Sequence, residues 1–238
     1  MKIDALAFSA HPDDADMSCG GLLLKLKDMG YHTGIIDLTR GELSTNGNLK
    51  TRAEETKKAS DFLKLDLREN LKLEDSNIIN DVKSRIKVIN IIRKYKPDLA
   101  MVPYFKDRHP DHENAYKLLK DSIFIAGLEK FKTGFKKHRP NIVIHYMLHY
   151  QFEPSFIVDI SDYFSQKIKA VKAYKSQIYS EFEKNAETHI SSKYFLDALH
   201  SRDKCYGLKI MVQYGEPYYI EKAIKVNDPI NFFNYVYF

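Results

Sequence analysis

The alternation of short apolar runs with helical patterns is the feature that most restricts how this sequence can fold. Residues 3–10 form an apolar run, and leucines at residues 22–26 follow with helical spacing before Gly30. Residues 33–39 repeat the apolar run, and Thr51-Arg-Ala-Glu has the capping-box pattern of a helix start. Strands that alternate with helices favour a parallel sheet covered on both faces, so we expect an α/β fold.

The same alternation continues to about residue 126. A short strand is predicted near Leu71–Leu73, and residues 78–95 have the apolar spacing of a helix that Pro97 ends. Residues 98–104 resemble a buried strand, and a helix is expected over residues 112–126. Ligand sites of such sheets lie beyond the C-terminal ends of the strands.

The last third of the chain has a weaker pattern. Strands are expected at residues 141–150 and 155–160, and helices at residues 162–178 and 191–206. An aromatic tail follows, and we expect it to pack on the core or on another subunit; its residues are Tyr218, Tyr219, Phe232, Phe233, Tyr235, Tyr237 and Phe238. No linker or repeat divides the chain, so one domain over residues 1–238 is predicted.

Composition excludes several classes of function. Hydrophobic residues make up 44% of the chain and charged residues 29%, and no apolar segment of about 18 residues could span a bilayer. The net charge of +5 comes from lysines spread along the sequence, which argues against a nucleic-acid-binding face. The N-terminus does not resemble a signal peptide, and two cysteines are too few for a disulfide framework, so we expect a cytoplasmic protein.

Two clusters of histidine and aspartate each follow a predicted strand. Ala10-His-Pro-Asp-Asp-Ala-Asp16 comes after the first strand, and Asp107-Arg-His-Pro-Asp-His112 comes after the strand that ends near Tyr104. Carboxylates gathered at a buried sheet end repel one another, and a bound cation makes such a cluster tolerable. The first cluster alone could also be a helix N-cap, because the helix dipole stabilises aspartates there. The second cluster at the same edge favours a metal site.

The residue types in these clusters suit zinc. Two imidazoles and a carboxylate make the ligand set of a catalytic zinc site, with a fourth position left for a water whose pKa falls to about 7. One aspartate of the Asp13-Asp14 pair would bind the metal, and its neighbour would act as a general base. Iron(II) accepts the same ligands, so Fe²⁺ is the alternative metal. Cys19 is interpreted as a small apolar residue at a helix start.

The pairing of Ala-His-Pro-Asp-Asp-x-Asp with Arg-His-Pro-Asp-His resembles the LmbE/PIG-L zinc N-deacetylase family. The resemblance implies a Rossmann-like fold and the removal of acetyl from a glucosamine nitrogen. It also implies that Asp13 is the base and that the metal ligands are His11, Asp14 and His112.

The family pattern assigns a role to the second cluster as well. It implies that His109, oriented by Asp111, is the cation that stabilises the tetrahedral oxyanion. Asp16 stands where the family usually has glutamate, at a position that is not a metal ligand in the pattern.

A longer stretch, Leu38-Thr-Arg-Gly-Glu-Leu-Ser-Thr-Asn-Gly with Arg52 shortly after, resembles the bacillithiol-biosynthesis branch, which deacetylates N-acetylglucosaminyl malate. The malyl group carries two carboxylates, which suit the fork of an arginine. Arg40, Arg52 and Arg108 are therefore candidate substrate contacts, with a surface ion pair as the alternative for each, and Tyr194 is a fourth candidate. The resemblance also implies a homo-oligomer, with a hexamer as one form.

Three functions fit these residues. The first is deacetylation of an N-acetylglucosaminide with an acidic aglycone, and the second is zinc-dependent hydrolysis of another N-acetyl sugar or amide. The third is a non-catalytic sugar-binding or metal-binding module. Asp13 argues against the module, because a structural ion does not need an additional uncoordinated carboxylate.

Overall fold

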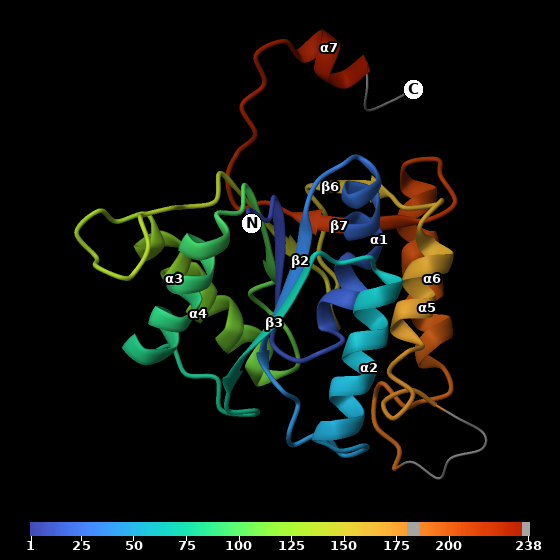
Figure 1. The fold of residues 1–238 in the computed structure, drawn as a ribbon. Helices are drawn as coiled ribbons and strands as arrows, with labels where there is room; N and C mark the ends of the chain where they lie inside the picture. Colours follow the sequence, from blue (N-terminus) through green and yellow to red (C-terminus); the bar gives the residue numbers. More distant parts are fainter. Residues whose placement is uncertain (180–185, 235–238) are drawn as a thin grey trace.

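The computed structural model describes residues 1–179 and 186–234 and is built on one seven-stranded sheet (Figure 1). Its strands are β1 Ala5–Ser9, β2 Thr33–Thr39, β3 Leu67–Leu73, β4 Leu99–Pro103, β5 Ile142–Tyr146, β6 Phe156–Asp159 and β7 Gly215–Tyr219. They lie in the order β3-β2-β1-β4-β5-β7-β6. The first five strands pair in parallel, and β7 runs antiparallel to both β5 and β6. The predicted α/β class with a mostly parallel sheet is confirmed.

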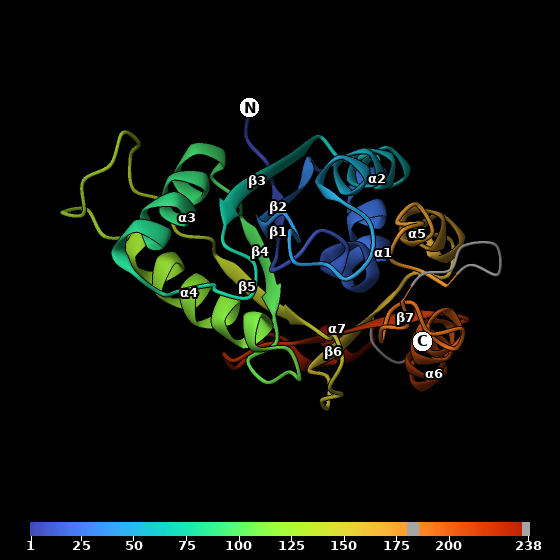
Figure 2. The ribbon, with the colours of Figure 1, turned by 90° about the horizontal axis from the view of Figure 1, so that it is seen from below.

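Helices cover both faces of this sheet, as the view in Figure 2 shows. The helices are α1 Asp14–Asp28, α2 Leu49–Phe62, α3 Val82–Tyr95, α4 Pro110–Ala126, α5 Phe164–Val171, α6 Phe195–Lys209 and α7 Pro229–Asn234. One hydrophobic cluster joins α3 and α4 to the sheet, and a second joins α1, α2 and α5 to its other face. Fully buried strand residues such as Phe8 and Ile35 contribute to the two clusters, which explains the continuous apolar runs in the sequence.

Two local predictions are wrong, and one strand was not predicted. Helix α2 begins two residues before the predicted capping box, because the side chain of Asn48 accepts the backbone N–H groups of Lys50 and Thr51. The predicted helix over residues 162–178 ends at Val171, and the chain turns there. Strand β7 was not predicted from its sequence, Gly-Glu-Pro-Tyr-Tyr, which lacks an alternating pattern.

The aromatic tail divides into two parts. Tyr218 is fully buried in β7, whereas Phe232 is 40% exposed on α7, which stands clear of the rest of the molecule in Figure 1. The prediction that the whole tail packs on its own core is therefore wrong for α7. Packing of α7 on another subunit stays a prediction. Tyr235, Tyr237 and Phe238 lie outside the described residues. Among the described helices, none is long and apolar enough to cross a membrane.

The C-terminal strand holds helix α1 in place through a buried carboxylate. The two oxygens of Glu216 accept the backbone N–H groups of Gly21 and Leu22, each at 2.8 Å. The ammonium of Lys167 lies 2.8 Å from Glu216 and 2.5 Å from Asp203, and these three side chains are fully buried. Because every charge in this group has a partner, the group can stay buried and fix α1.

We expect Gly21→Ala to destabilise the protein. A Cβ atom at this position would lie 2.7 Å from Cγ2 of Ile160 and 2.9 Å from Oε1 of Glu216. Overpacking costs about 1–3 kcal/mol and alanine recovers about 1 kcal/mol of helix propensity, so a net loss of up to about 2 kcal/mol is expected in urea unfolding. Gly134→Ala is the control, because no atom lies within 4 Å of its added Cβ. Equal stability of the two variants would contradict this account of α1.

Candidate active site

The two motif loops lie side by side because their strands are neighbours. Strand β1 pairs with β2 on one side and with β4 on the other, with Ala5 opposite Leu99. The strand order therefore reverses at β1, and open α/β sheets bind ligands at such a point. A pocket of about 540 Å³ opens there, and both motif loops line it.

Three predicted metal ligands meet at the bottom of this pocket. Oδ2 of Asp14 lies 3.6 Å from Nδ1 of His11, and its Oδ1 lies 3.4 Å from Nε2 of His112. Donors around a tetrahedral zinc ion with bonds of about 2.0–2.1 Å stand about 3.3 Å apart. The chemistry of these donors fits zinc, and each of the two distances is close to that separation.

Carboxylates behind the two imidazoles fix their orientation. Nε2 of His11 lies 3.2 Å from both Asp75 and Asp111, and Nδ1 of His112 lies 2.8 Å from Asp107. Each ring thus has one nitrogen on a carboxylate and the other toward Asp14, the arrangement of many metal-bound histidines. Burial alone would lower the imidazole pKa values, but the carboxylates raise that of His11 well above its usual value and that of His112 to about 9.

Asp13, the predicted base, occupies a strained position at the start of α1. Its φ angle of 120° lies in a region that residues other than glycine rarely adopt, and its side chain is buried beside the pocket. Burial raises its pKa to about 6, although the guanidinium of Arg52 opposes that rise. Strain at a site residue is tolerated only where surrounding contacts hold it.

His109 caps α4 and lies against both metal-facing histidines. Its ring centroid is 4.8 Å from that of His11 and 4.9 Å from that of His112. Nδ1 of His109 accepts the backbone N–H of Asp111 at 3.2 Å, so the neutral ring carries its proton on Nε2. Burial, with the fields of His11 and His112, lowers the pKa of His109.

The structure contradicts the prediction that the carboxylate of Asp111 orients the ring of His109. That carboxylate faces away from His109 toward His11, and it also accepts the backbone N–H of Ser76 at 2.7 Å. The contact between Asp111 and His109 uses the backbone amide instead, because His109 occupies the N-cap position of the helix.

The four candidate substrate contacts lie in different environments. Arg108 is exposed and lines the pocket, and so does Tyr194, whose side chain is 65% exposed. Arg40 is exposed on the loop that follows β2, where its Nε lies 4.0 Å from Glu42, and it does not line the pocket. Arg52 is buried against Asp13.

Four residues of the site had no role in the sequence prediction. Asp75 follows β3 and His149 follows β5, while Asp107 stands inside the second motif. Asp107 accepts Nδ1–H groups and backbone amides, including those of His149, and the ring of His189 lies 5.0 Å from that of His149. The only sequence signal for Asp75 and His149 is their place just after a strand.

Asp16 lies beside the site but faces away from the metal donors. Two nitrogens of Arg68 each lie 2.9 Å from its oxygens, and Arg68 also binds Asp37. This agrees with a position that is not a ligand in the family pattern.

Known proteins with related sequences and structures support an enzymatic site. The family model described as GlcNAc-PI de-N-acetylase, PIG-L, matches residues 6–123. Diacetylchitobiose deacetylase of Thermococcus kodakarensis is 29% identical over 187 residues, which cover 72% of this chain and 69% of the relative. The conserved protein TT1542 of Thermus thermophilus is 33% identical with a TM-score of 0.86, covering 94% of this chain and 98% of that one. For N,N'-diacetylchitobiose deacetylase of Pyrococcus horikoshii, the values are 26% identity, a TM-score of 0.78, and 90% and 82% coverage.

Asp107→Asn is expected to weaken zinc binding without unfolding the chain. The carboxylate holds the nitrogen of His112 that faces away from the other metal donors, and loss of such a partner costs about 10- to 100-fold in metal affinity. Zinc affinity is measured by competition with a chromophoric chelator. Asp121→Asn on the exposed face of α4 is the control and should retain the wild-type affinity. An unchanged affinity in Asp107→Asn would show that His112 is not held for a metal.

Proposed function

Because the chain belongs to the PIG-L family of de-N-acetylases, we propose that it is a zinc-dependent hydrolase that removes the acetyl group from an N-acetylglucosaminide. One observation carries the proposal: a buried carboxylate, Asp13, lies beside three metal donors that face a pocket. A structural zinc site is closed by four protein ligands, whereas a catalytic site keeps one position open. With His11, Asp14 and His112 as the ligands, the fourth position stays open for water, which favours catalysis over a binding module.

The proposed reaction divides the work between the metal and the chain. Zinc held by His11, Asp14 and His112 would lower the pKa of a coordinated water and polarise the acetyl carbonyl. Asp13 accepts a proton from the water that attacks the carbonyl carbon, and it returns that proton to the nitrogen as the C–N bond breaks. Nε2–H of His109 donates to the carbonyl oxygen as negative charge develops there. Acetate and the free amine are the products.

The finer proposal is that the sugar carries a malyl group, as in N-acetylglucosaminyl malate of bacillithiol biosynthesis. Arg108 and His189 lie on the pocket wall beside His149, and the permanent cation of Arg108 suits an anionic aglycone. A neutral N-acetyl sugar is the alternative, because the relative from Thermococcus kodakarensis is a diacetylchitobiose deacetylase. Tyr194 and Arg40 stay predicted contacts.

Assembly and location belong to the same proposal. We propose a homo-oligomer in the cytoplasm, with a hexamer as one form, on the basis of the family resemblance. The exposed Phe232 of α7 is consistent with a subunit contact. The prediction of one domain over residues 1–238 also stays a prediction.

Asp13→Asn should abolish deacetylation and keep the metal. Loss of a general base costs about 10²- to 10⁴-fold in kcat, measured as acetate release, while zinc content stays near that of the wild type. His112→Ala should lose zinc and activity together. Asp28→Asn, at the exposed end of the same helix, is the control and should change neither quantity. Undiminished acetate release from Asp13→Asn would exclude the mechanism.

Substitution of Arg108 tests the acidic aglycone. If Arg108 binds the malyl group, Arg108→Ala should lower kcat/KM for N-acetylglucosaminyl malate by about 10-fold or more and leave turnover of N-acetylglucosamine unchanged. Lys106→Ala is the comparison, because Lys106 is an exposed cation of the same loop but lies outside the pocket lining. A wild-type enzyme that cleaves N-acetylglucosamine as fast as the malate glycoside would favour the alternative substrate.

A further inference from the structure

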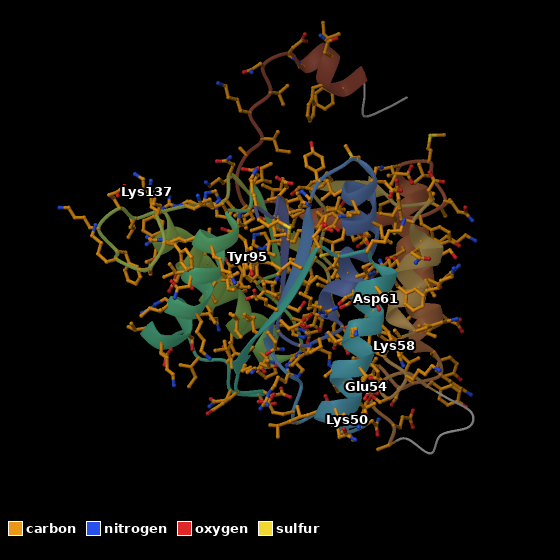
Figure 3. The ribbon with its side chains drawn as sticks, in the orientation of Figure 1. Lys50, Glu54, Lys58, Asp61, Tyr95 and Lys137 are labelled. Carbon is orange, nitrogen blue, oxygen red and sulfur yellow. The ribbon has the colours of Figure 1, made fainter. Side chains whose placement is uncertain are left out.

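A buried arginine closes one side of Asp13. Arg52 lies on the inward face of α2 and is only 3% exposed. Figure 3 shows the outward face of the same helix, which carries the exposed charged residues Lys50, Glu54, Lys58 and Asp61. Arg52 is therefore unlike these solvent-facing charges, since its guanidinium is turned into the molecule toward the pocket floor.

The guanidinium binds one oxygen of Asp13 and the peptide before it. Nη1 and Nη2 of Arg52 each lie 3.2 Å from Oδ2 of Asp13, and Nη2 also donates to the carbonyl oxygen of Pro12 at 2.5 Å. Of the hydrogen bonds formed between described residues, none involves Oδ1 of Asp13. The arginine thus occupies one carboxylate oxygen and leaves the other without a hydrogen bond to a described residue, in a side chain that lines the pocket.

The contact with Pro12 bears on the backbone strain at Asp13. The φ angle of 120° at Asp13 follows directly from the orientation of the Pro12–Asp13 peptide. Such a conformation persists only when neighbouring contacts hold it, and the bond from Arg52 to the Pro12 carbonyl is a contact of that kind. One side chain therefore restrains both the backbone and the carboxylate of Asp13.

The residues around the guanidinium of Arg52 leave it little room to move. Its Cζ lies 5.3 Å from the ring centroid of Tyr174, and a Cβ atom on Gly41 would lie 3.3 Å from Nη2. Gly41 has a φ of +64°, so a side chain there is disfavoured by both the backbone and the space. A lysine in place of Arg52 would keep the charge but could not bind Asp13 and Pro12 with two nitrogens.

We infer that Arg52 is a positioning residue for Asp13, which fixes Oδ2 and the strained turn so that Oδ1 is aimed at the attacking water, and that it does not bind the substrate. The inference rests on the proposed deacetylation for its catalytic consequence. The near-complete burial of Arg52 supports it, because a substrate carboxylate would find little of the guanidinium to contact.

Arg52→Lys is the principal test, with steady-state kinetics on N-acetylglucosamine and on its malate glycoside. A displaced base should lower kcat by about 10- to 100-fold on both substrates and leave KM within about twofold. Guanidinium ion should restore part of the activity of Arg52→Ala. Arg93→Lys is the matched control, since Arg93 is 2% exposed and holds the carbonyl oxygens of Ala126 and Leu128 on the other face of the sheet. Arg93→Lys should lower stability but not kcat.

Combination with Asp13→Asn shows whether Arg52 acts through Asp13. If it does, Arg52→Lys should reduce the residual activity of Asp13→Asn by no more than about twofold, because the side chain that it positions is already disabled. A multiplicative loss in the double variant would overturn the inference. A rise in KM for the malate glycoside alone, with kcat unchanged, would overturn it in favour of substrate binding.

Unfolding measurements separate this inference from the proposed function. Arg52→Met should lower the urea midpoint because it leaves the buried Asp13 without its cation, and Asp13→Asn in the same chain should recover part of that loss. Additive shifts of the midpoint would overturn the inference. Failure of the wild type to release acetate from any N-acetyl sugar would instead overturn the proposed function, and the midpoint shifts would still decide whether Arg52 holds Asp13.

Discussion

The concentration of buried carboxylates beyond the C-terminal ends of β1 to β4 is the constraint on which this structure depends. Buried aspartates from strand β2 and from the loops and helices that follow β1, β3 and β4 gather there; they are Asp13, Asp14, Asp16, Asp37, Asp75, Asp107 and Asp111. A buried unpaired charge costs several kcal/mol, so each carboxylate must have a cation or several hydrogen-bond donors. The surrounding residues supply these partners in two chemically different ways. Arginines pair with carboxylates of the supporting structure, and histidines pair with carboxylates of the site.

Arginines compensate the carboxylates that stay fixed, and histidines compensate those that face the metal position. Arg68 binds Asp16 and Asp37, and Arg52 binds Asp13. Arginine keeps its charge at any ordinary pH, so these pairs are permanent. The imidazoles around Asp14 can instead exchange a proton for a metal ion, because metal ligands must be deprotonated. The same acidic cluster is therefore held by permanent ion pairs on one side and carries the proposed zinc ligands on the other.

The sequence predicts the parts of this arrangement that depend on residues close together in the chain. It does not predict the parts that depend on contacts between distant residues. Strands such as Thr33–Thr39 and the order of the first helices follow from local periodicity, and the His-Pro-Asp motifs indicate the proposed metal donors because these stand within a few positions of a strand end. The orientation of His11 by Asp75 depends on where the loop after β3 passes, which spacing does not encode. The early end of α5 has the same cause, since Tyr174 leaves the helix to pack on Arg52.

The second half of the chain completes a site whose metal donors lie in the first half. The family match ends at residue 123, yet Glu216 holds α1, the helix that begins at the metal-binding turn. His149, His189 and Tyr194 from the same half line the pocket wall. Because the proposed metal ligands and much of the pocket wall come from different parts of the chain, one hydrolytic chemistry can serve different acetylated sugars. The choice of substrate should therefore vary with Arg108 and with residues after β5, while His11, Asp14 and His112 stay the same.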